Sequence, residues 1–220
     1  MMKTKAVVFD AYGTLFDVNS AAEKCKDKIG VKWETFANFW RTTQLEYTWL
    51  RSLMKRHKNF WDITEDSLDK SMKVFNVNNN MKNELLSLYK ILSPYPEVRG
   101  VLKDLKKKKF KLSILSNGTP DLLNELVENN KLNNLFDDLF SIEEVKIYKP
   151  DPSVYELPVK KYKIKSGEIT FLSANTWDVS GGGNFGYNSI WVNRHNSVFD
   201  ILDFQPKNEV SNLTQLLDIV

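Results

Sequence analysis

Residues 5–15 read Lys5-Ala6-Val7-Val8-Phe9-Asp10-Ala11-Tyr12-Gly13-Thr14-Leu15, a short apolar run followed by one carboxylate. The apolar residues 6–9 are typical of a buried strand in a parallel sheet, and Gly13 then interrupts regular structure. Ligands of open α/β sheets bind at the carboxyl ends of the strands, so Asp10 stands where chemistry usually occurs. Asp10 is therefore either a nucleophile that forms an ester or a residue that ends the strand and caps the following turn.

The composition is that of an ordinary globular protein. The 220 residues are 42% hydrophobic and 27% charged, with a formal net charge of +3, which gives no strong reason to expect a nucleic-acid partner. The single cysteine, Cys25, excludes an intramolecular disulfide or a cysteine-based zinc scaffold. No apolar run approaches the roughly 18 residues of a membrane span, and no signal-peptide pattern precedes Asp10. We therefore expect a cytoplasmic protein without a nucleic-acid or membrane partner.

Helical and strand patterns divide the chain into two parts. Four helical patterns follow one another without a strand between them, at residues 20–30, 33–58, 64–75 and 81–92. Ser20 and Thr64 are the expected N-caps of two of these helices. After a break at 93–96, further strands alternate with helices, at residues 110–115, 139–141, 168–173 and 188–193.

This alternation predicts an α/β fold with a doubly wound, parallel, Rossmann-like sheet. We expect residues 1–15 and 94–220 to form this core domain. Residues 16–93 are expected to form an inserted helical cap subdomain. A short Gly-rich helix is expected to begin at Asp178, and residues 213–220 are expected to form a closing helix.

Polar side chains stand where the predicted strands end. The carboxyl ends of parallel strands meet at one edge of a sheet, so these side chains are expected to gather there. The gathered set contains two carboxylates, one ammonium group, hydroxyls and amides, but no histidine. Its members are Asp10, Thr14, Ser116, Asn117, Lys149, Ser173, Asn175 and Asp178.

These residue types argue against a dedicated site for a divalent metal. Magnesium prefers several hard oxygen ligands, commonly two or more carboxylates, whereas position 12 is Tyr12 and the fourth strand end offers only Asp178. Lys149 can instead neutralise Asp10. An ionised, partly desolvated carboxylate beside a fixed cation is suited to attack a carbon that bears a good leaving group. We therefore expect neither a metal nor another cofactor.

Four ordered motifs point to one family. They read Phe9-Asp10-Ala11-Tyr12-Gly13-Thr14-Leu15-Phe16-Asp17, Leu115-Ser116-Asn117-Gly118, Tyr148-Lys149-Pro150-Asp151 with Val154-Tyr155-Glu156, and Ser173-Ala174-Asn175-Thr176-Trp177-Asp178. A helical run adds to them: Trp40-Arg41 and then Gln44-Leu45-Glu46-Tyr47-Thr48-Trp49-Leu50-Arg51-Ser52-Leu53-Met54. With these motifs the whole chain resembles the L-2-haloacid dehalogenases, the type II branch of the haloacid dehalogenase superfamily. Thr42 departs from the Gln that related enzymes often carry there, which puts substrate size in question rather than the reaction.

The resemblance implies a metal-independent hydrolysis of short-chain L-2-haloalkanoic acids to 2-hydroxy acids, with inversion and through an ester on Asp10. The partners would be a small-molecule 2-haloacid and the halide product. The resemblance also implies roles for the site residues. For the ester chemistry, Lys149 would neutralise Asp10, and Thr14, Ser173 and the base Asp178 would place the lytic water. Arg41, Asn175 and Asn117 would receive the halide, Ser116 would bind the substrate carboxylate, and Tyr155 would support the network. The apolar wall around the substrate would be formed by Tyr12, Leu45, Phe60 and Trp177.

Ordinary structural roles are open for several of these residues. Arg41 could be a surface arginine on an amphipathic helix and Lys149 a solvated loop lysine, and Leu45, Phe60 and Trp177 could equally belong to the core. A magnesium-dependent phosphatase of the same superfamily is the alternative function, although it needs a second acid two residues after the nucleophile. A catalytically silent binding module is a second alternative. The aromatic-rich cap could also supply a homodimer interface.

Overall fold

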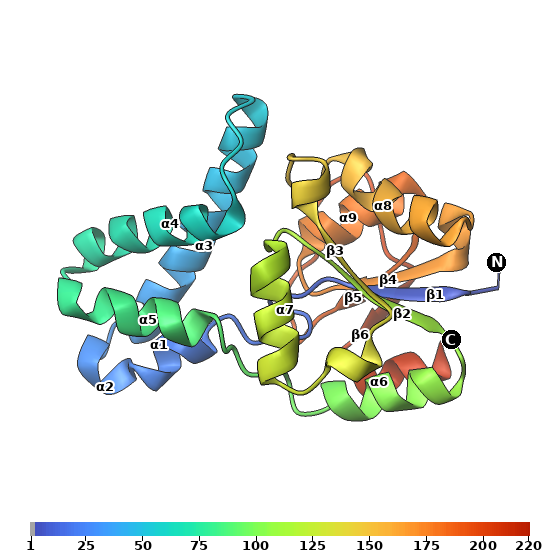
Figure 1. Cartoon of the computed structure of the whole chain (residues 1–220), viewed down its shortest axis with the longest axis horizontal. Coiled ribbons are helices and arrows are strands. Elements are labelled where there is room, and N and C mark those ends of the chain that lie inside the picture. The colour runs from blue at the N-terminus through green and yellow to red at the C-terminus, as the bar shows by residue number, and fades with distance from the viewer. Residues whose placement is uncertain (1–2) are drawn as a thin grey trace.

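Six parallel strands form one sheet in the computed structural model, which describes residues 3–220 (Figure 1). The strands are β1 (Ala6–Phe9), β2 (Lys111–Ser116), β3 (Asp138–Ser141), β4 (Ile169–Ser173), β5 (Asn188–Val192) and β6 (Asn208–Val210). Their spatial order is β3-β2-β1-β4-β5-β6. The chain changes direction across the sheet at β1, which therefore lies at the topological switch point. The predicted doubly wound parallel sheet is confirmed.

Helices cover both faces of the sheet. The α-helices of this part are α6 (Val98–Lys107), α7 (Pro120–Asn129), α8 (Pro152–Tyr162) and α9 (Thr176–Phe185). Helices α8 and α9 pack together on one side, and α6 lies on the other (Figure 1). Short 3-10 helices complete the connections, at η2 (Asn133–Leu135), η3 (Ile142–Glu144), η4 (Ser166–Glu168) and η5 (Leu213–Asp218). Because β1 is buried along its whole length, the sheet is a layer between helices.

A separate set of helices lies to one side of the sheet (Figure 1). It contains α1 (Ser20–Lys24), α2 (Lys26–Ile29), α3 (Trp33–Leu53), α4 (Phe60–Phe75), η1 (Asn79–Met81) and α5 (Lys82–Tyr89). Two backbone hydrogen bonds join the segments that enter and leave this set, from Asp17 N–H to Ser93 O (2.9 Å) and from Tyr95 N–H to Leu15 O (3.0 Å). The inserted helical cap is thus confirmed, while its limits at residues 16 and 93 stay a prediction. Over residues 3–220, each helix is too short or too polar to span a lipid bilayer.

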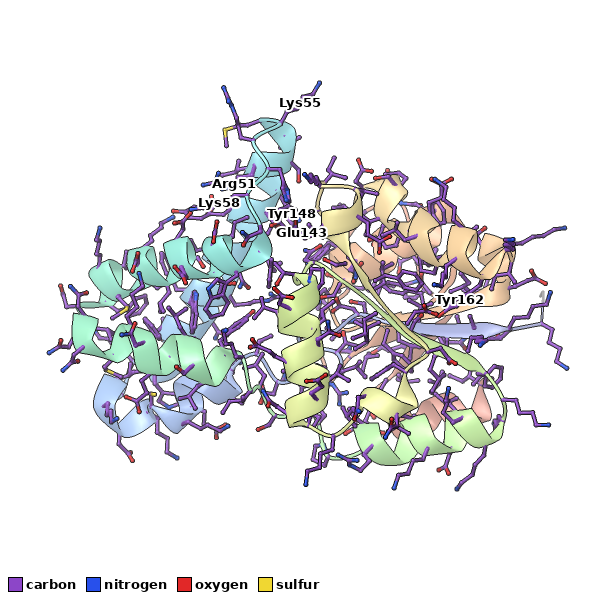
Figure 2. All side chains as sticks on the ribbon, viewed as in Figure 1. Arg51, Lys55, Lys58, Glu143, Tyr148 and Tyr162 are labelled. Carbon is purple, nitrogen blue, oxygen red and sulfur yellow. The ribbon has the colours of Figure 1, made fainter. Side chains whose placement is uncertain are left out.

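Tyr148 of the core makes two hydrogen bonds to the cap. Its hydroxyl donates to Lys58 O (2.6 Å) and its backbone N–H donates to Ser52 Oγ (3.2 Å). His57 of the cap lies 3.0 Å from Glu143 of the core through its Nε2 atom. Figure 2 shows Tyr148 and Glu143 on the side of the core that faces the end of α3. Because Tyr148 precedes Lys149, the cap is fastened next to a predicted site residue.

Several predicted helix starts were wrong. Residues 20–30 form two short helices that meet at Cys25, and the Ser20 hydroxyl donates to Asp17 O (2.8 Å) instead of capping a helix. Helix α4 begins four residues earlier than predicted, because the Asn59 side chain accepts from Asp62 N–H and caps it. Thr64 therefore lies inside α4, where its hydroxyl donates to Phe60 O. Residue types that favour N-caps also occur inside helices, so the sequence alone does not show which of them caps the helix.

Other element limits also differ from the prediction. Helix α3 ends at Leu53 rather than residue 58, and α9 begins at Thr176 rather than Asp178. The closing segment is the 3-10 helix η5 rather than an α-helix. Strand β6 was not predicted, because its three residues, Asn208-Glu209-Val210, contain a single apolar side chain. None of these differences moves a predicted strand that carries a site residue.

Gly181 allows α9 to lie close to α8. A Cβ atom at this position would lie 2.5 Å from the Tyr155 hydroxyl oxygen and 2.7 Å from Pro150 Cβ. Gly100, in α6, is a matched control, because a Cβ atom there would have no neighbour within 4 Å.

We therefore expect Gly181→Ala to lower the free energy of unfolding by about 1–3 kcal/mol, the usual cost of overpacking. Gly100→Ala should leave it unchanged or raise it by up to about 1 kcal/mol, because alanine is the better helix former. Urea unfolding of both variants measures the difference. Equal stability of the two variants would contradict the close packing of α8 and α9.

Candidate active site

The Asp10 carboxylate is held by three side chains at the end of β1. Its Oδ1 atom accepts from Lys149 Nζ (3.2 Å), and its Oδ2 atom accepts from Thr14 Oγ1 (3.0 Å) and Asn175 Nδ2 (2.9 Å). Asp10 is only 5% exposed. The three donors come from the loop after β1, the segment before α8 and the start of α9, so the parallel sheet brings them together as predicted.

Lys149 connects two buried carboxylates. Its ammonium group also donates to Asp178 Oδ2 (2.9 Å), and both side chains are fully buried. The Lys149 backbone N–H donates to Asn117 Oδ1 (3.2 Å), which fixes the segment that carries the ammonium. A fully buried lysine between two acids is not the solvated loop lysine of the alternative interpretation.

Asp178 and Tyr155 form the next layer of this network. The Tyr155 hydroxyl donates to Asp178 Oδ1 (2.7 Å). Burial raises the pKa of Asp178 to about 6, although the Lys149 ammonium opposes this shift. Burial, together with the Asp178 charge, raises the pKa of Tyr155 well above its ordinary value. Tyr155 therefore remains a hydrogen-bond donor over the physiological range.

The end of β4 forms a second side of the site. Thr14 Oγ1 accepts from the Ala174 backbone N–H (2.8 Å), and Ser173 Oγ accepts from the Asn175 backbone N–H (3.1 Å). Ser173 is fully buried. These bonds join the loop after β1 to the turn between β4 and α9, so the Thr14 hydroxyl lies between Asp10 and that turn.

Ser116 and Asn117 end β2, the other neighbour of β1. Ser116 Oγ accepts from the Gly118 backbone N–H (3.1 Å), and Ser116 is fully buried. Asn117 is 6% exposed, with its side-chain oxygen engaged by Lys149. Their expected contacts with a substrate carboxylate and a halide stay predictions.

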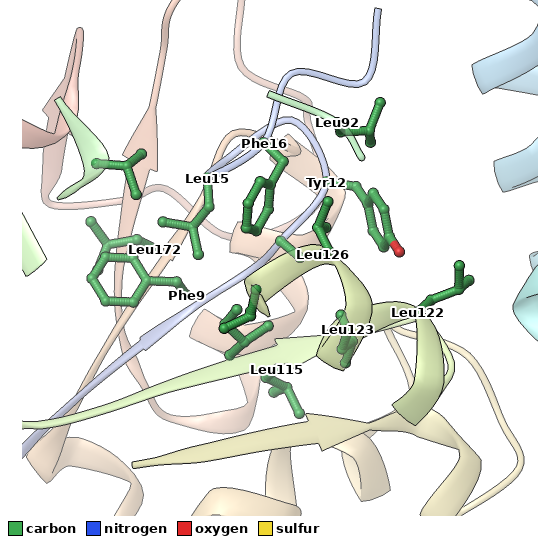
Figure 3. Packing of buried hydrophobic residues seen from close by; sticks show 14 of the residues in the cluster. Phe9, Tyr12, Leu15, Phe16, Leu92, Leu115, Leu122, Leu123, Leu126 and Leu172 are labelled. Carbon is green, nitrogen blue, oxygen red and sulfur yellow. The ribbon is translucent and has the colours of Figure 1, made fainter. Parts of the chain in front are cut away.

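Aromatic rings of the core and of the cap pack together beside this polar cluster. The Tyr12 ring lies 5.3 Å from the Phe60 ring and 5.7 Å from the Tyr89 ring, centroid to centroid. Figure 3 shows Tyr12 beside Leu15 and Phe16 in the apolar cluster that surrounds the end of β1. Tyr89 was missed in the sequence, because a tyrosine on the apolar face of a predicted helix is indistinguishable from a core residue.

Arg41 is half-buried on α3 and donates to Gln44 Oε1 (2.9 Å). Gln44, which is 1% exposed, donates in turn to Thr64 Oγ1 (2.6 Å) and to the Tyr89 hydroxyl (3.1 Å). Gln44 thus orients Arg41 by hydrogen bonds to two other cap helices. The sequence signal for Gln44 was its spacing of three residues from Arg41, which places both side chains on one helix face.

Leu45 and Trp177 are less closely tied to the polar cluster. Leu45 is half-buried on α3, one turn after Arg41. The Trp177 ring packs edge-on against Trp49 of α3, with centroids 5.4 Å apart. Trp177 also lines, with Asn175 and Gly13, a cavity of about 270 Å³. Trp177 therefore connects the core to the cap beside the site, and the wall role of Leu45 stays a prediction.

The comparisons with known proteins agree on one family. The model of the haloacid dehalogenase-like hydrolases matches residues 4–186. (S)-2-haloacid dehalogenase 1 of Pseudomonas sp. (strain CBS-3) is 39% identical over 214 residues, which are 96% of this chain and 94% of that protein. A solved structure of a dehalogenase with an intermediate complex has a TM-score of 0.97 at 34% identity, covering 100% of this chain and 99% of that one.

A further solved structure is the L-2-haloacid dehalogenase from Xanthobacter autotrophicus with chloropropionic acid covalently bound. It has a TM-score of 0.91 at 32% identity and covers 98% of each chain. These relatives match this chain over nearly its full length, cap and core alike. The chain therefore belongs to the haloacid dehalogenase-like hydrolases and, within them, to the family of the L-2-haloacid dehalogenases.

Proposed function

We propose that this chain hydrolyses short-chain L-2-haloalkanoic acids to 2-hydroxy acids with inversion, through an ester on Asp10. The observation that carries the proposal is the buried Asp10 carboxylate at the switch point of the sheet, 3.2 Å from Lys149 Nζ. The names of the relatives support the substrate class, and the covalently bound chloropropionic acid in one of them supports a covalent intermediate.

In the first step, a carboxylate oxygen of Asp10 attacks C2 of the substrate opposite the halogen. A C–O bond forms, the carbon–halogen bond breaks, and the halide leaves with the bonding electrons, so the configuration at C2 inverts. Negative charge develops on the halogen, so a guanidinium placed there stabilises the transition state more than the ground state. We assign this role to Arg41, which Gln44 orients, with the amides of Asn175 and Asn117.

In the second step, water attacks the carboxyl carbon of the Asp10 ester. Asp178 takes one proton from the water as its oxygen bonds to the carboxyl carbon. The ester C–O bond then breaks, and the leaving oxygen takes that proton back from Asp178, which releases the 2-hydroxy acid. Asp10 is left as a carboxylic acid and loses its proton to solvent, which regenerates both carboxylates. We assign the binding of this water to Thr14 and Ser173, whose hydroxyls lie at the junction of β1 and β4. Lys149 lies between Asp10 and Asp178 and stabilises negative charge on either carboxylate.

The substrate carboxylate would bind at the end of β2, at Ser116 and the backbone N–H groups near it. The carbon chain would lie against Tyr12 and Phe60, whose rings pack together at 5.3 Å, with Leu45 and Trp177 at the margin. An apolar wall of this kind keeps water from the nucleophile until the ester has formed.

The donor set supports chemistry without a metal. The Lys149 ammonium lies between the two carboxylates, where a phosphatase would need a divalent cation. Tyr12 also replaces the second acid that the phosphatase alternative requires, and its pKa is raised by burial. Over residues 3–220, no group of three or more His, Cys, Asp and Glu side chains is arranged to hold a metal.

We also propose a homodimer through the end of α3. Leu53 and Met54 are 80% and 60% exposed there, and the end of α3 projects beyond the other helices (Figure 1). Exposed apolar side chains gathered on a projecting element are typical of an interface, and the molar mass in solution tests this. The cytoplasmic location and the absence of a nucleic-acid partner stay predictions.

We expect the purified chain to release halide from (S)-2-chloropropionate much faster than from the (R)-enantiomer, in excess chelator as in its absence. Asp10→Asn should release no halide, because an amide is not a nucleophile toward C2, while its far-ultraviolet circular dichroism stays that of the wild type. Halide release that stops with chelator and returns with magnesium would refute the proposal.

The pKa of Asp178, about 6, predicts an acid limb in the pH profile. Only the ionised carboxylate can take a proton from water, so kcat should be constant above pH 7. In the ester, the negative charge of Asp10 that raises the pKa of Asp178 is gone, so kcat should fall by about tenfold per pH unit below a pKa that lies under 6. Stopped assays from pH 4.5 to 8 measure the profile, and Asp178→Asn should be slow without this limb. An Asp178→Asn variant that keeps the wild-type kcat and its decrease at acid pH would contradict the assignment of Asp178 as the base.

A further inference from the structure

Arg194 follows β5 and is almost completely buried, with 9% of its side chain exposed. Its Nη2 group donates to Thr14 O (2.8 Å), and its Nη1 group lies 2.7 Å from Glu97 Oε1. Its guanidinium carbon lies 3.7 Å from the centroid of the Tyr95 ring. Arg194 therefore makes three distinct interactions, one of them with the backbone of Thr14.

The contact with Thr14 bears on the nucleophile. The Thr14 hydroxyl donates to Asp10 Oδ2 (3.0 Å) and accepts from the Ala174 N–H (2.8 Å). Thr14 follows Gly13, whose φ of +87° belongs to a tight turn. In such a turn a shift of the Thr14 backbone also moves the Thr14 hydroxyl. The Arg194 guanidinium binds the Thr14 carbonyl oxygen, which is two covalent bonds from the Thr14 Cα, and it therefore fixes the position from which the side chain extends.

The contacts with Glu97 and Tyr95 fix Arg194 itself. Both residues belong to the segment by which the chain leaves the cap, and Tyr95 N–H donates to Leu15 O (3.0 Å). The single guanidinium thus joins the entering segment, at Thr14, to the leaving segment. Lysine has no planar fork with which to make the same three contacts at once.

We propose that Arg194 is a positioning residue of the dehalogenation site, acting through Thr14 on the Asp10 carboxylate; the inference rests on the proposed function. Arg194 does not touch Asp10. It keeps the Thr14 hydroxyl within hydrogen-bonding distance of Asp10. It also binds both of the segments that connect the cap to the core. Misplacement of a reacting group by about 1 Å can lower a rate by about a hundredfold, so loss of this hold is expected to affect kcat more than KM.

The test compares Arg194→Lys with Arg99→Lys. Arg99 also donates to two backbone carbonyls, those of Asn130 and Lys131, but on an exposed surface of α6. We expect Arg194→Lys to lower kcat for (S)-2-chloropropionate about tenfold with KM within about twofold, and Arg99→Lys to match the wild type. Glu97→Gln removes the charge that pairs with the Arg194 guanidinium, so it should also lower kcat, by a smaller factor than Arg194→Lys.

A double-mutant cycle separates positioning from general structural support. In a Thr14→Val background the hydroxyl is absent, so Arg194→Lys should lower kcat by less than about twofold, instead of about tenfold. Equal factors in both backgrounds, or no effect of either Arg194→Lys or Glu97→Gln, would overturn the inference while leaving the proposed function intact. An inactive wild-type chain would instead overturn the proposed function and this inference with it. If Arg194→Lys does not fold, the same cycle is carried out with Glu97→Gln.

Discussion

The Lys149 ammonium lies between the Asp10 and Asp178 carboxylates, and the rest of the site depends on this interaction. Two buried acids at neighbouring strand ends would repel each other, and one would take up a proton. The ammonium at 3.2 Å and 2.9 Å offsets that repulsion. Removing one member of such a buried group commonly costs about 3–5 kcal/mol, because the remaining charge is left unpaired. The site must therefore form as a unit.

The same arrangement gives the two carboxylates different properties. Asp10 accepts from Lys149, Thr14 and Asn175 at the open end of β1. Asp178 lies deeper, where burial raises its pKa to about 6. Two acids with different surroundings can serve as nucleophile and base in one reaction. The fold produces this difference by placing one carboxylate at a strand end and the other in the first turn of α9.

Most of the sheet and of the polar cluster at its edge could be predicted from the sequence, because the polar site residues come at the ends of short apolar strands. β1 was predicted at its observed limits, and the polar residues after β1, β2 and β4 meet as expected. Side-chain partners that come from another element could not be predicted. Gln44 is held by Thr64 and Tyr89 of two other cap helices, and Arg194 reaches back from the loop after β5 to Thr14. Such contacts depend on tertiary packing, which local periodicity does not encode.

In the proposed mechanism Asp10, and not water, forms the new bond to C2 of the substrate. A single turnover in ¹⁸O-water, with the protein in excess over (S)-2-chloropropionate, tests it most directly. We predict a 2-hydroxy acid without ¹⁸O and one ¹⁸O atom in the peptide that contains Asp10, because water attacks the ester carbonyl. An ¹⁸O-labelled product with an unlabelled Asp10 peptide would show that water attacks C2 directly and that Asp10 is not the nucleophile.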